Sequence, residues 1–465
     1  MTRATVDLLL RGGRVHLPGG GSGLLDVAVE GDEIVALLEP GSTHITARSS
    51  LDAGGRDVLP GIIDPHFQSG NLNGVEDFGT ESRAAAVGGV TTILRMHRSL
   101  EPYAAGLEET IAEYESRAWV DFAFHLALMT EAHLVELPSY VERFGVTSFK
   151  MFTAYKRDMP QSANLQGVDD GMLLDLLTRI SEFGGRALVH CENQEVNDRR
   201  LATRPPDADG LAAWAATRPP EAEAEAMLRV GFLASLVHCP IYLVHCSSAL
   251  ALDVVAYLRV RHPDLAVETI IHYLTHTMQS DVGLLAKVAP PLRTSEDVEA
   301  LWKGIATGTI QTIGSDHVPY TRAAKLGDNI WDTRLGLPGT GLILPVMLSE
   351  GVAQGRISMA HLVELTAENP ARLFGLERKG RIAPGMEADL VVVDRHLERA
   401  VDPTRLHGAS DWSLYDGMVL RGWPVATISR GRVVASNGEP LGAPGHGRFV
   451  RRRPTVEIAR ETVAS

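Results

Sequence analysis

From about residue 57 to residue 381, short apolar segments alternate with longer segments whose apolar residues recur at helical spacing. Such alternation builds a parallel sheet, because each helix returns the chain to start the next strand in the same direction. Over this length we predict a closed (β/α)8 TIM-like barrel, with an open doubly wound α/β sheet as the alternative. No GxGxxG motif follows an early strand, which favours the barrel. Predicted strands span 90–96, 186–190, 241–245, 266–270 and 310–313, and predicted helices span 82–87, 172–183, 221–236, 249–260 and 295–307.

Both ends of the chain instead have β character. Segments 6–10, 25–29, 33–38, 380–384, 388–393 and 425–434 are predicted strands. We therefore expect residues 1–56 and 382–445 to form one small, discontinuous β-sandwich domain beside a barrel of residues 57–381. Residues 446–465 include Arg451, Arg452 and Arg453 and are expected to form a solvated C-terminal arm.

The composition excludes several classes of partner. The formal charge of −14 argues against nucleic acid or an anionic membrane. No run reaches the roughly 20 apolar residues that cross a bilayer. The first residues enter a strand pattern directly, so we expect no secretory leader. Three cysteines form no CxxC pair, so we expect a reducing, cytoplasmic location.

Five polar side chains stand at the ends of predicted strands: His66, Lys150, His190, His245 and Asp316. Taken singly, each has an ordinary interpretation, since an aspartate there often caps a helix and a histidine is often a hydrogen-bonded core residue. In a barrel, however, the carboxyl ends of all strands meet at one rim. Three imidazoles, a carboxylate and a lysine gathered there predict a metal site.

Two of these positions are informative about the metal chemistry. His66 and Gln68 alternate along one strand exit, so both side chains can point at one centre. Lys150 as an ammonium cannot bind a cation. Burial lowers the pKa of a lysine, and the neutral amine can take up CO2 to give an anionic carbamate ligand. Such a carbamate can bridge two divalent ions about 3.5–4 Å apart.

Together these motifs resemble the amidohydrolase superfamily, in its cyclic-amidase branch of dihydropyrimidinases, hydantoinases, allantoinases and dihydroorotases. The resemblance covers nearly the whole chain, and Tyr155, five residues after Lys150, favours the hydantoinase and dihydropyrimidinase side. The motifs that carry it are Pro-Gly-Ile-Ile-Asp-Pro-His at 60–66, Ser-Phe-Lys-Met-Phe-Thr-Ala-Tyr-Lys at 148–156, His-Cys-Glu-Asn at 190–193, Val-His-Cys-Ser at 244–247, Pro-Pro-Leu-Arg at 290–293, Gly-Ser-Asp-His at 314–317 and Lys-Gly-Arg-Ile-Ala-Pro-Gly-Met-Glu-Ala-Asp-Leu at 379–390.

The resemblance implies a barrel with a β-sandwich and a two-metal centre, usually zinc, bridged by carboxylated Lys150 and a hydroxide. His190 and His245 would hold one ion, and His66, position 68 and Asp316 the other. It also implies a small cyclic amide or imide as substrate and a homo-oligomer, either a tetramer or a dimer.

The same resemblance implies a mechanism. The metal-bound hydroxide would attack the ring amide carbon, and Tyr155 and one metal would stabilise the oxyanion. Asp316 would take the proton and pass it to the leaving nitrogen. His317 would support the site from behind.

Gln68 departs from the branch, which normally carries histidine at this position. A glutamine offers only a neutral amide oxygen, a weaker ligand than imidazole. Three outcomes are open: Gln68 ligates and the centre holds two ions, zinc or manganese; that side stays empty and one ion works; or the centre is lost and the protein is a non-catalytic scaffold.

Residues where the family holds its substrate also differ. Ala289 stands before Pro-Pro-Leu-Arg, and Leu335 stands in the family's Asn-Gly-x-Pro-Gly segment. Arg98 follows the second barrel strand, where it is either a surface residue or a partner for a substrate carboxylate. Gly70 replaces the arginine of dihydroorotases and argues against dihydroorotate. We predict a metal-dependent hydrolase of hydantoin-like or dihydropyrimidine-like rings; an allantoin-like or acyclic amide substrate is the alternative.

Overall fold

Eight parallel strands form the sheet that carries the site in the computed structural model, which describes residues 4–42, 44–70, 74–156, 164–262 and 264–454. Each strand pairs with the next one along the chain, so the spatial order is the sequence order. The strands are β6 (Ile62–Phe67), β7 (Val90–His97), β8 (Asp121–Ala127), β9 (Ser148–Phe152), β10 (Arg186–His190), β11 (Ile241–Leu243), β12 (Leu265–Ile270) and β13 (Thr312–Gly314).

The first and last strands of this sheet meet and close the barrel. Phe67 and His317 form a parallel bridge, and the backbone N–H of Gln68 donates to the carbonyl of His317 at 2.9 Å. The fully buried carboxylate of Asp64 accepts a hydrogen bond from the Ser315 hydroxyl at 2.5 Å. The predicted (β/α)8 barrel is confirmed, and the open sheet is excluded.

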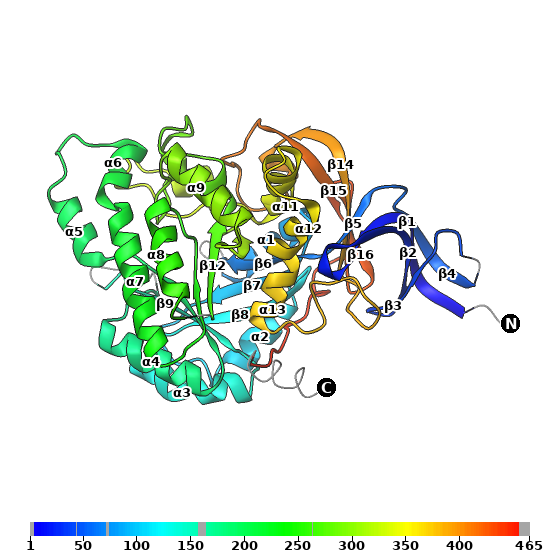
Figure 1. Cartoon of the computed structure of the whole chain (residues 1–465), viewed down its shortest axis with the longest axis horizontal. Helices are drawn as coiled ribbons and strands as arrows, with labels where there is room; N and C mark the ends of the chain where they lie inside the picture. Colours follow the sequence, from blue (N-terminus) through cyan, green and yellow to red (C-terminus); the bar gives the residue numbers. More distant parts are fainter. Residues whose placement is uncertain (1–3, 43, 71–73, 157–163, 263, 455–465) are drawn as a thin grey trace.

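Helices cover the outside of the barrel (Figure 1). The helix predicted at 172–183 is α4, which buries Leu173, Leu176, Leu177 and Ile180 at the spacing of one helical face. Its start is capped by Asp169, whose side chain accepts from the Met172 N–H. The helices are α1 (Val75–Val87), α2 (Leu107–Glu115), α3 (Glu131–Glu142), α4 (Asp170–Glu182), α5 (Gln194–Ala202), α6 (Gly210–Thr217), α7 (Pro220–Leu236), α8 (Ala249–Arg259), α9 (Ser295–Ala306), α10 (Arg322–Lys325), α11 (Ile343–Val346), α12 (Met359–Val363) and α13 (Asn369–Phe374). None of the helices in the described part of the chain combines the length and apolarity needed to cross a bilayer.

A separate nine-stranded sheet joins the two ends of the chain beside the barrel (Figure 1). Its order is β17-β16-β15-β14-β5-β1-β2-β3, and β4 pairs with β1. The strands are β1 (Ala4–His16), β2 (Ser22–Glu30), β3 (Glu33–Leu38), β4 (Ile45–Asp52), β5 (Asp57–Pro60), β14 (Leu390–Ala400), β15 (Val419–Ser429), β16 (Arg432–Ser436) and β17 (Glu439–Pro440).

Two strand predictions in this sheet were wrong. The segment 380–384 forms turns, with Gly380 at φ 80° and Gly385 at φ 88°, which breaks an extended run. The segment 425–434 is a hairpin instead of one strand, because Arg430 and Gly431 turn the chain with positive φ between β15 and β16.

The basic segment near the C-terminus is not simply solvated, which corrects the expectation for Arg452. This side chain is buried, and it donates to the Ser148 hydroxyl at 2.7 Å and to the carbonyl of Phe124. Arg451 and Arg453 are exposed, as expected. The segment therefore packs against strands β8 and β9 of the barrel, through this guanidinium and through the pairing of Phe449 with Phe122.

A buried lysine ties the end sheet to the barrel. The ammonium of Lys379 lies 2.8 Å from Asp121 on β8, 2.6 Å from Glu387 and 2.6 Å from Asp389. Burial alone would lower the pKa of Lys379, but the charges of Asp121 and Asp389 outweigh it and raise the pKa. The ion network holds three carboxylates that would otherwise repel one another.

Replacing Lys379 with methionine is expected to lower the free energy of unfolding by about 3–5 kcal/mol, because Asp389 loses its buried counterion and Asp121 is left with Arg430 alone. Urea unfolding followed by circular dichroism measures the change. Lys303, exposed on α9, is the matched control, and Lys303→Met should shift the value by less than about 0.5 kcal/mol. Equal losses in both variants would contradict a special role for the network.

Candidate functional site

A cavity of about 610 Å³ opens at the carboxyl ends of the barrel strands. The ten residues predicted for the site all line it, although they come from strand ends and loops spread over 270 positions of sequence. They are His66, Gln68, Arg98, Lys150, Tyr155, His190, His245, Ala289, Asp316 and Leu335.

Two imidazoles face each other on one side of the cavity. Nδ1 of His190 lies 3.0 Å from Nε2 of His245, and burial lowers the pKa of both rings, so both are neutral. The other ring nitrogen of His190 lies 2.8 Å from the carboxylate of Glu192, so it carries the proton. The lone pair of His190 therefore points toward His245, as a metal ligand requires.

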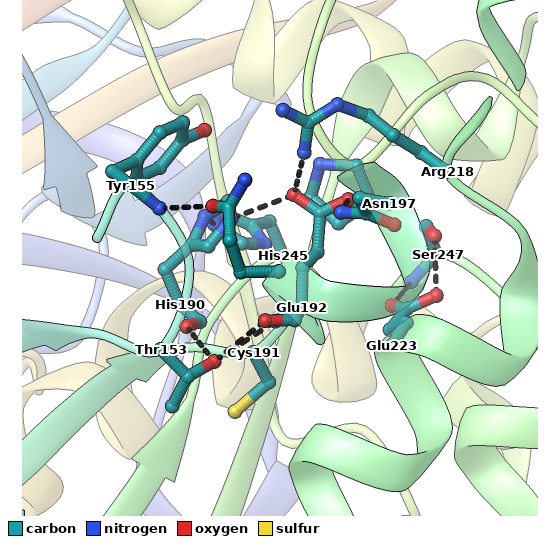
Figure 2. A network of polar contacts seen from close by, with 12 residues as sticks. Thr153, Tyr155, His190, Cys191, Glu192, Asn197, Arg218, Glu223, His245 and Ser247 are labelled. Carbon is teal, nitrogen blue, oxygen red and sulfur yellow. Dashed lines mark hydrogen bonds and ion pairs between the residues drawn. The ribbon is translucent and has the colours of Figure 1, made fainter. Parts of the chain in front are cut away.

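Glu192 is itself held in place by a cation (Figure 2). Arg218 donates to it at 2.5 Å, and Asn197 donates to its second oxygen at 3.3 Å. Burial would raise the pKa of Glu192, but the charge of Arg218 and the hydrogen bond from His190 lower it to about 2. Glu192 is thus a permanent carboxylate that sets the tautomer of His190.

Glu268 organises the other histidines. This fully buried carboxylate lies 2.8 Å from Nδ1 of His66 and accepts the backbone N–H of His245 at 3.1 Å. Its second oxygen accepts the hydroxyl of Tyr242 at 2.8 Å. The contact at Nδ1 leaves Nε2 of His66 facing the cavity with its lone pair.

Asp316 and Lys150 complete the group of donors around His66. Nε2 of His66 lies 3.2 Å from the carboxylate of Asp316 and 3.5 Å from the amine of Lys150. The side-chain amide of Gln68 donates to the same Asp316 oxygen at 2.8 Å. Burial lowers the pKa of Lys150 to about 8, against the opposing charges of Asp316 and Glu268.

The backbone is strained at three positions in this site. Tyr155, His245 and Asp316 have φ values of 65°, 41° and 44°, in the left-handed region that residues other than glycine rarely adopt. Such conformations cost about 1–3 kcal/mol each and persist where surrounding contacts impose them. Here these conformations turn two candidate metal ligands, His245 and Asp316, and the phenol of Tyr155 toward the cavity.

These donors fit a divalent cation. Ring nitrogens about 3 Å apart match two ligands that each lie about 2.0–2.1 Å from one ion. The rings of His66 and His245 stack with centroids 5.4 Å apart, so the donors on the two sides of the cavity adjoin. The acidic group of Asp121, Glu387 and Asp389 also has the spacing of a cation site, but the Lys379 ammonium fills it.

The residues predicted to contact substrate surround this donor set. The ring of Tyr155 lies 5.1 Å from that of His190, and its backbone N–H donates to Gln194 at 2.7 Å. Ala289 lies in a small apolar cluster with Trp214 and Ile330, and Leu335 packs against this cluster. His317 does not line the cavity: it stacks on Phe67 and lies 2.9 Å from Glu81, in a supporting position.

Sequence reasoning missed the supporting carboxylates. Glu268 interrupts the apolar strand Leu265–Ile270, and a charged residue inside a buried strand was the signal that could have found it. Glu192 belongs to the His-Cys-Glu-Asn motif but had been given no role. Arg218 carries no local signal, because its partner lies 26 residues away in the sequence.

The comparisons with known proteins agree with this geometry. Residues 245–434 match the model of the amidohydrolase family. The chain is 34% identical over 429 residues to a D-phenylhydantoinase of Escherichia coli O1:K1, covering 87% of this chain and 90% of the relative.

Solved structures are similar over almost the whole chain. A dihydropyrimidinase from Brevibacillus agri NCHU1002 superposes with a TM-score of 0.87 at 32% identity, covering 96% of this chain and 98% of that one. An L-hydantoinase (dihydropyrimidinase) from Arthrobacter aurescens superposes with a TM-score of 0.89 at 30% identity, covering 96% and 100%.

Replacing Glu268 with glutamine should weaken zinc binding by about 10–100-fold, because the carboxylate that orients His66 and His245 is lost. Competition with a chromophoric chelator measures the affinity. Glu223→Gln is the control: this buried carboxylate accepts hydrogen bonds from Ser247 and Ser248 and pairs with Arg293. Wild-type affinity in the Glu268 variant, or an equal loss in both, would refute the orienting role.

Proposed function

Because the chain belongs to the amidohydrolase family, in the cyclic-amidase branch that includes the hydantoinases, we propose that it hydrolyses a ring amide or imide of hydantoin or dihydropyrimidine type. The observation that carries the proposal is the convergence of three imidazoles, Lys150 and Asp316 on one cavity at the carboxyl rim of the barrel. The names of the relatives support the same chemistry, since they are hydantoinases and dihydropyrimidinases.

Members of the amidohydrolase family generally use divalent metal ions, and zinc suits the nitrogen-rich donors of this chain, with manganese as the alternative. In this proposal His190 and His245 would hold one ion, His66, Asp316 and the amide of Gln68 would hold a second, and Lys150 would supply a further ligand. When bound, the cation supplies Lewis acidity that activates water and polarises the ring carbonyl.

Lys150 is proposed to act as a carbamate. A pKa of about 8 leaves a useful fraction of neutral amine near neutral pH, whereas an ordinary lysine is almost wholly protonated. The neutral amine attacks CO2, loses a proton and becomes an anionic oxygen ligand. Its burial among His66, Asp316 and Phe152 protects the product from bulk water.

Asp316 and Tyr155 are the residues proposed to act on the substrate. As water adds to the ring carbonyl carbon, Asp316 takes its proton and delivers it to the ring nitrogen when the carbon–nitrogen bond breaks. Burial raises the pKa of Tyr155, so its phenol keeps its proton and donates a hydrogen bond to the developing oxyanion.

The activity is tested with purified protein and a panel of hydantoin, dihydrouracil, allantoin and succinimide. We expect at least one ring to be opened. The activity should vanish on dialysis against a chelator and return with zinc or manganese, because the bound cation activates the attacking water. His245→Ala should abolish the turnover while the circular dichroism spectrum is kept. If the metal-loaded protein opens none of the four rings, the proposal is wrong.

Gln68 makes the two halves of the centre unequal. Its amide nitrogen already engages Asp316, and its oxygen is a weaker donor than imidazole. We therefore propose that the ion beside His66 is held more weakly than the ion beside His190.

Gln68→His should raise the zinc retained per chain after gel filtration, or strengthen the weaker site by about tenfold or more, because an imidazole replaces an amide. Elemental analysis measures the retained metal. Gln68→Ala is the matched control and should retain no more metal than the wild type. A wild-type protein that already keeps two ions as firmly as the histidine variant would overturn the inequality.

A further inference from the structure

The cavity is far more cationic than the chain that builds it. Its lining includes the guanidinium groups of Arg95, Arg98 and Arg334, and among the described lining residues Asp316 is the one carboxylate. The chain as a whole carries a formal charge of −14. Arginines concentrated in a cavity of an acidic protein attract anions toward it.

The arginines stand apart from the carboxylates that support the metal donors. Arg95 lies within β7 and Arg98 directly follows that strand, while Arg334 comes from the loop after α10. Glu268 and Glu192, by contrast, are buried behind His66 and His190. The cationic wall is therefore a separate feature of the cavity.

Arg95 is a buried positive charge that donates hydrogen bonds to Ser69 and His97, while the charge of the buried Asp77 also acts on it. It donates to the hydroxyl and the carbonyl of Ser69, both at 3.0 Å, and to Nδ1 of His97 at 2.9 Å. Its guanidinium also lies 4.6 Å from the centre of the Tyr114 ring. Burial, with smaller contributions from the charges of Arg95 and Arg98, lowers the pKa of the neighbouring His97 to about 3.

Arg98 brings this field to the place where substrate would sit. Its side chain is half-buried in the cavity lining. It lines the same cavity as Tyr155 and Asp316. Arg334 is exposed at the cavity and lies 5.6 Å from the centre of the Tyr320 ring, where it adds a second cation.

We propose that the ring substrate carries a carboxylate on a short side chain and that Arg98 binds this carboxylate, with Arg95 and Arg334 adding to the field. This inference rests on the proposed ring-opening function and specifies its substrate class. A guanidinium pairs with a carboxylate through two parallel hydrogen bonds, which also fixes the orientation of the ring. A cavity of about 610 Å³ has room for such a ring and its substituent.

The test compares 5-(2-carboxyethyl)hydantoin with its neutral, nearly isosteric amide, 5-(2-carbamoylethyl)hydantoin. The wild-type protein should open the acid with a kcat/KM at least about tenfold higher than that for the amide. A roughly tenfold difference corresponds to the smallest usual free-energy contribution of a hydrogen bond to a charged group. Arg98→Gln should reduce kcat/KM for the acid at least about tenfold more than for the amide, chiefly through KM. Arg98→Lys should fall between, because it keeps the charge but loses the bidentate geometry.

Arg200→Gln, at an exposed position of α5, controls for the loss of one positive charge and should leave the acid-to-amide ratio unchanged. Binding of both compounds to an Asp316→Asn background, with and without Arg98→Gln, is measured by calorimetry as a readout that needs no turnover. A preference for the acid that disappears with Arg98→Gln supports the proposal. Equal binding of acid and amide, or an equal loss of both in the Arg98 variant, overturns it.

The two proposals fail in different ways. If the protein opens the amide with the same kcat/KM as the acid, ring opening stands and the carboxylate preference is wrong. If it opens no ring but calorimetry still shows an Arg98-dependent preference for the acid, the ring-opening function is wrong and the anion site stands.

Discussion

The carboxylate of Glu268 connects the two halves of the proposed metal centre. One of its oxygens takes both the imidazole of His66 and the backbone of His245, and the other takes the hydroxyl of Tyr242. A buried charge of this kind is tolerable only when hydrogen bonds replace its water. The positions of His66 and His245 therefore both depend on the Glu268 carboxylate, and a shift of one imidazole would disturb the other.

Strain and closure act together with this charge. Asp64 on β6 ties down Ser315 at the end of β13, next to Asp316. Asp316 and His245 both adopt left-handed backbone conformations that a free loop would leave. The closed barrel supplies the contacts that hold them, so the stability of the fold and the geometry of the site are linked.

Charge is distributed by function across the molecule. Lys379 neutralises a buried acidic group at the junction of the two sheets, and Arg218 does the same for Glu192 behind the site. The arginines of the cavity are placed differently: Arg95 donates its hydrogen bonds to the uncharged groups of Ser69 and His97. Net charge alone would have suggested a cavity that repels anions.

Much of the architecture could be predicted because it is written in local patterns. The βα alternation predicted the barrel, and glycines after α1 and α4 marked helix ends within a residue or two. The polar residues at strand ends predicted which side chains would meet, since parallel strands share one polarity. The turn at Arg430-Gly431 was missed because the apolar residues on both sides of it predict buried strands but do not show where the chain reverses direction.

The sequence by itself determined the barrel, the sheet made from both chain ends, and the identity of the side chains that converge on the cavity. Only the tertiary structure decided how those side chains are oriented: Glu268 against His66, Arg218 against Glu192, and the amide of Gln68 against Asp316. The physical reason is that strand periodicity acts over neighbouring residues, whereas these contacts join residues 26 to 248 positions apart. They exist only once the barrel has closed and water has been excluded from its rim.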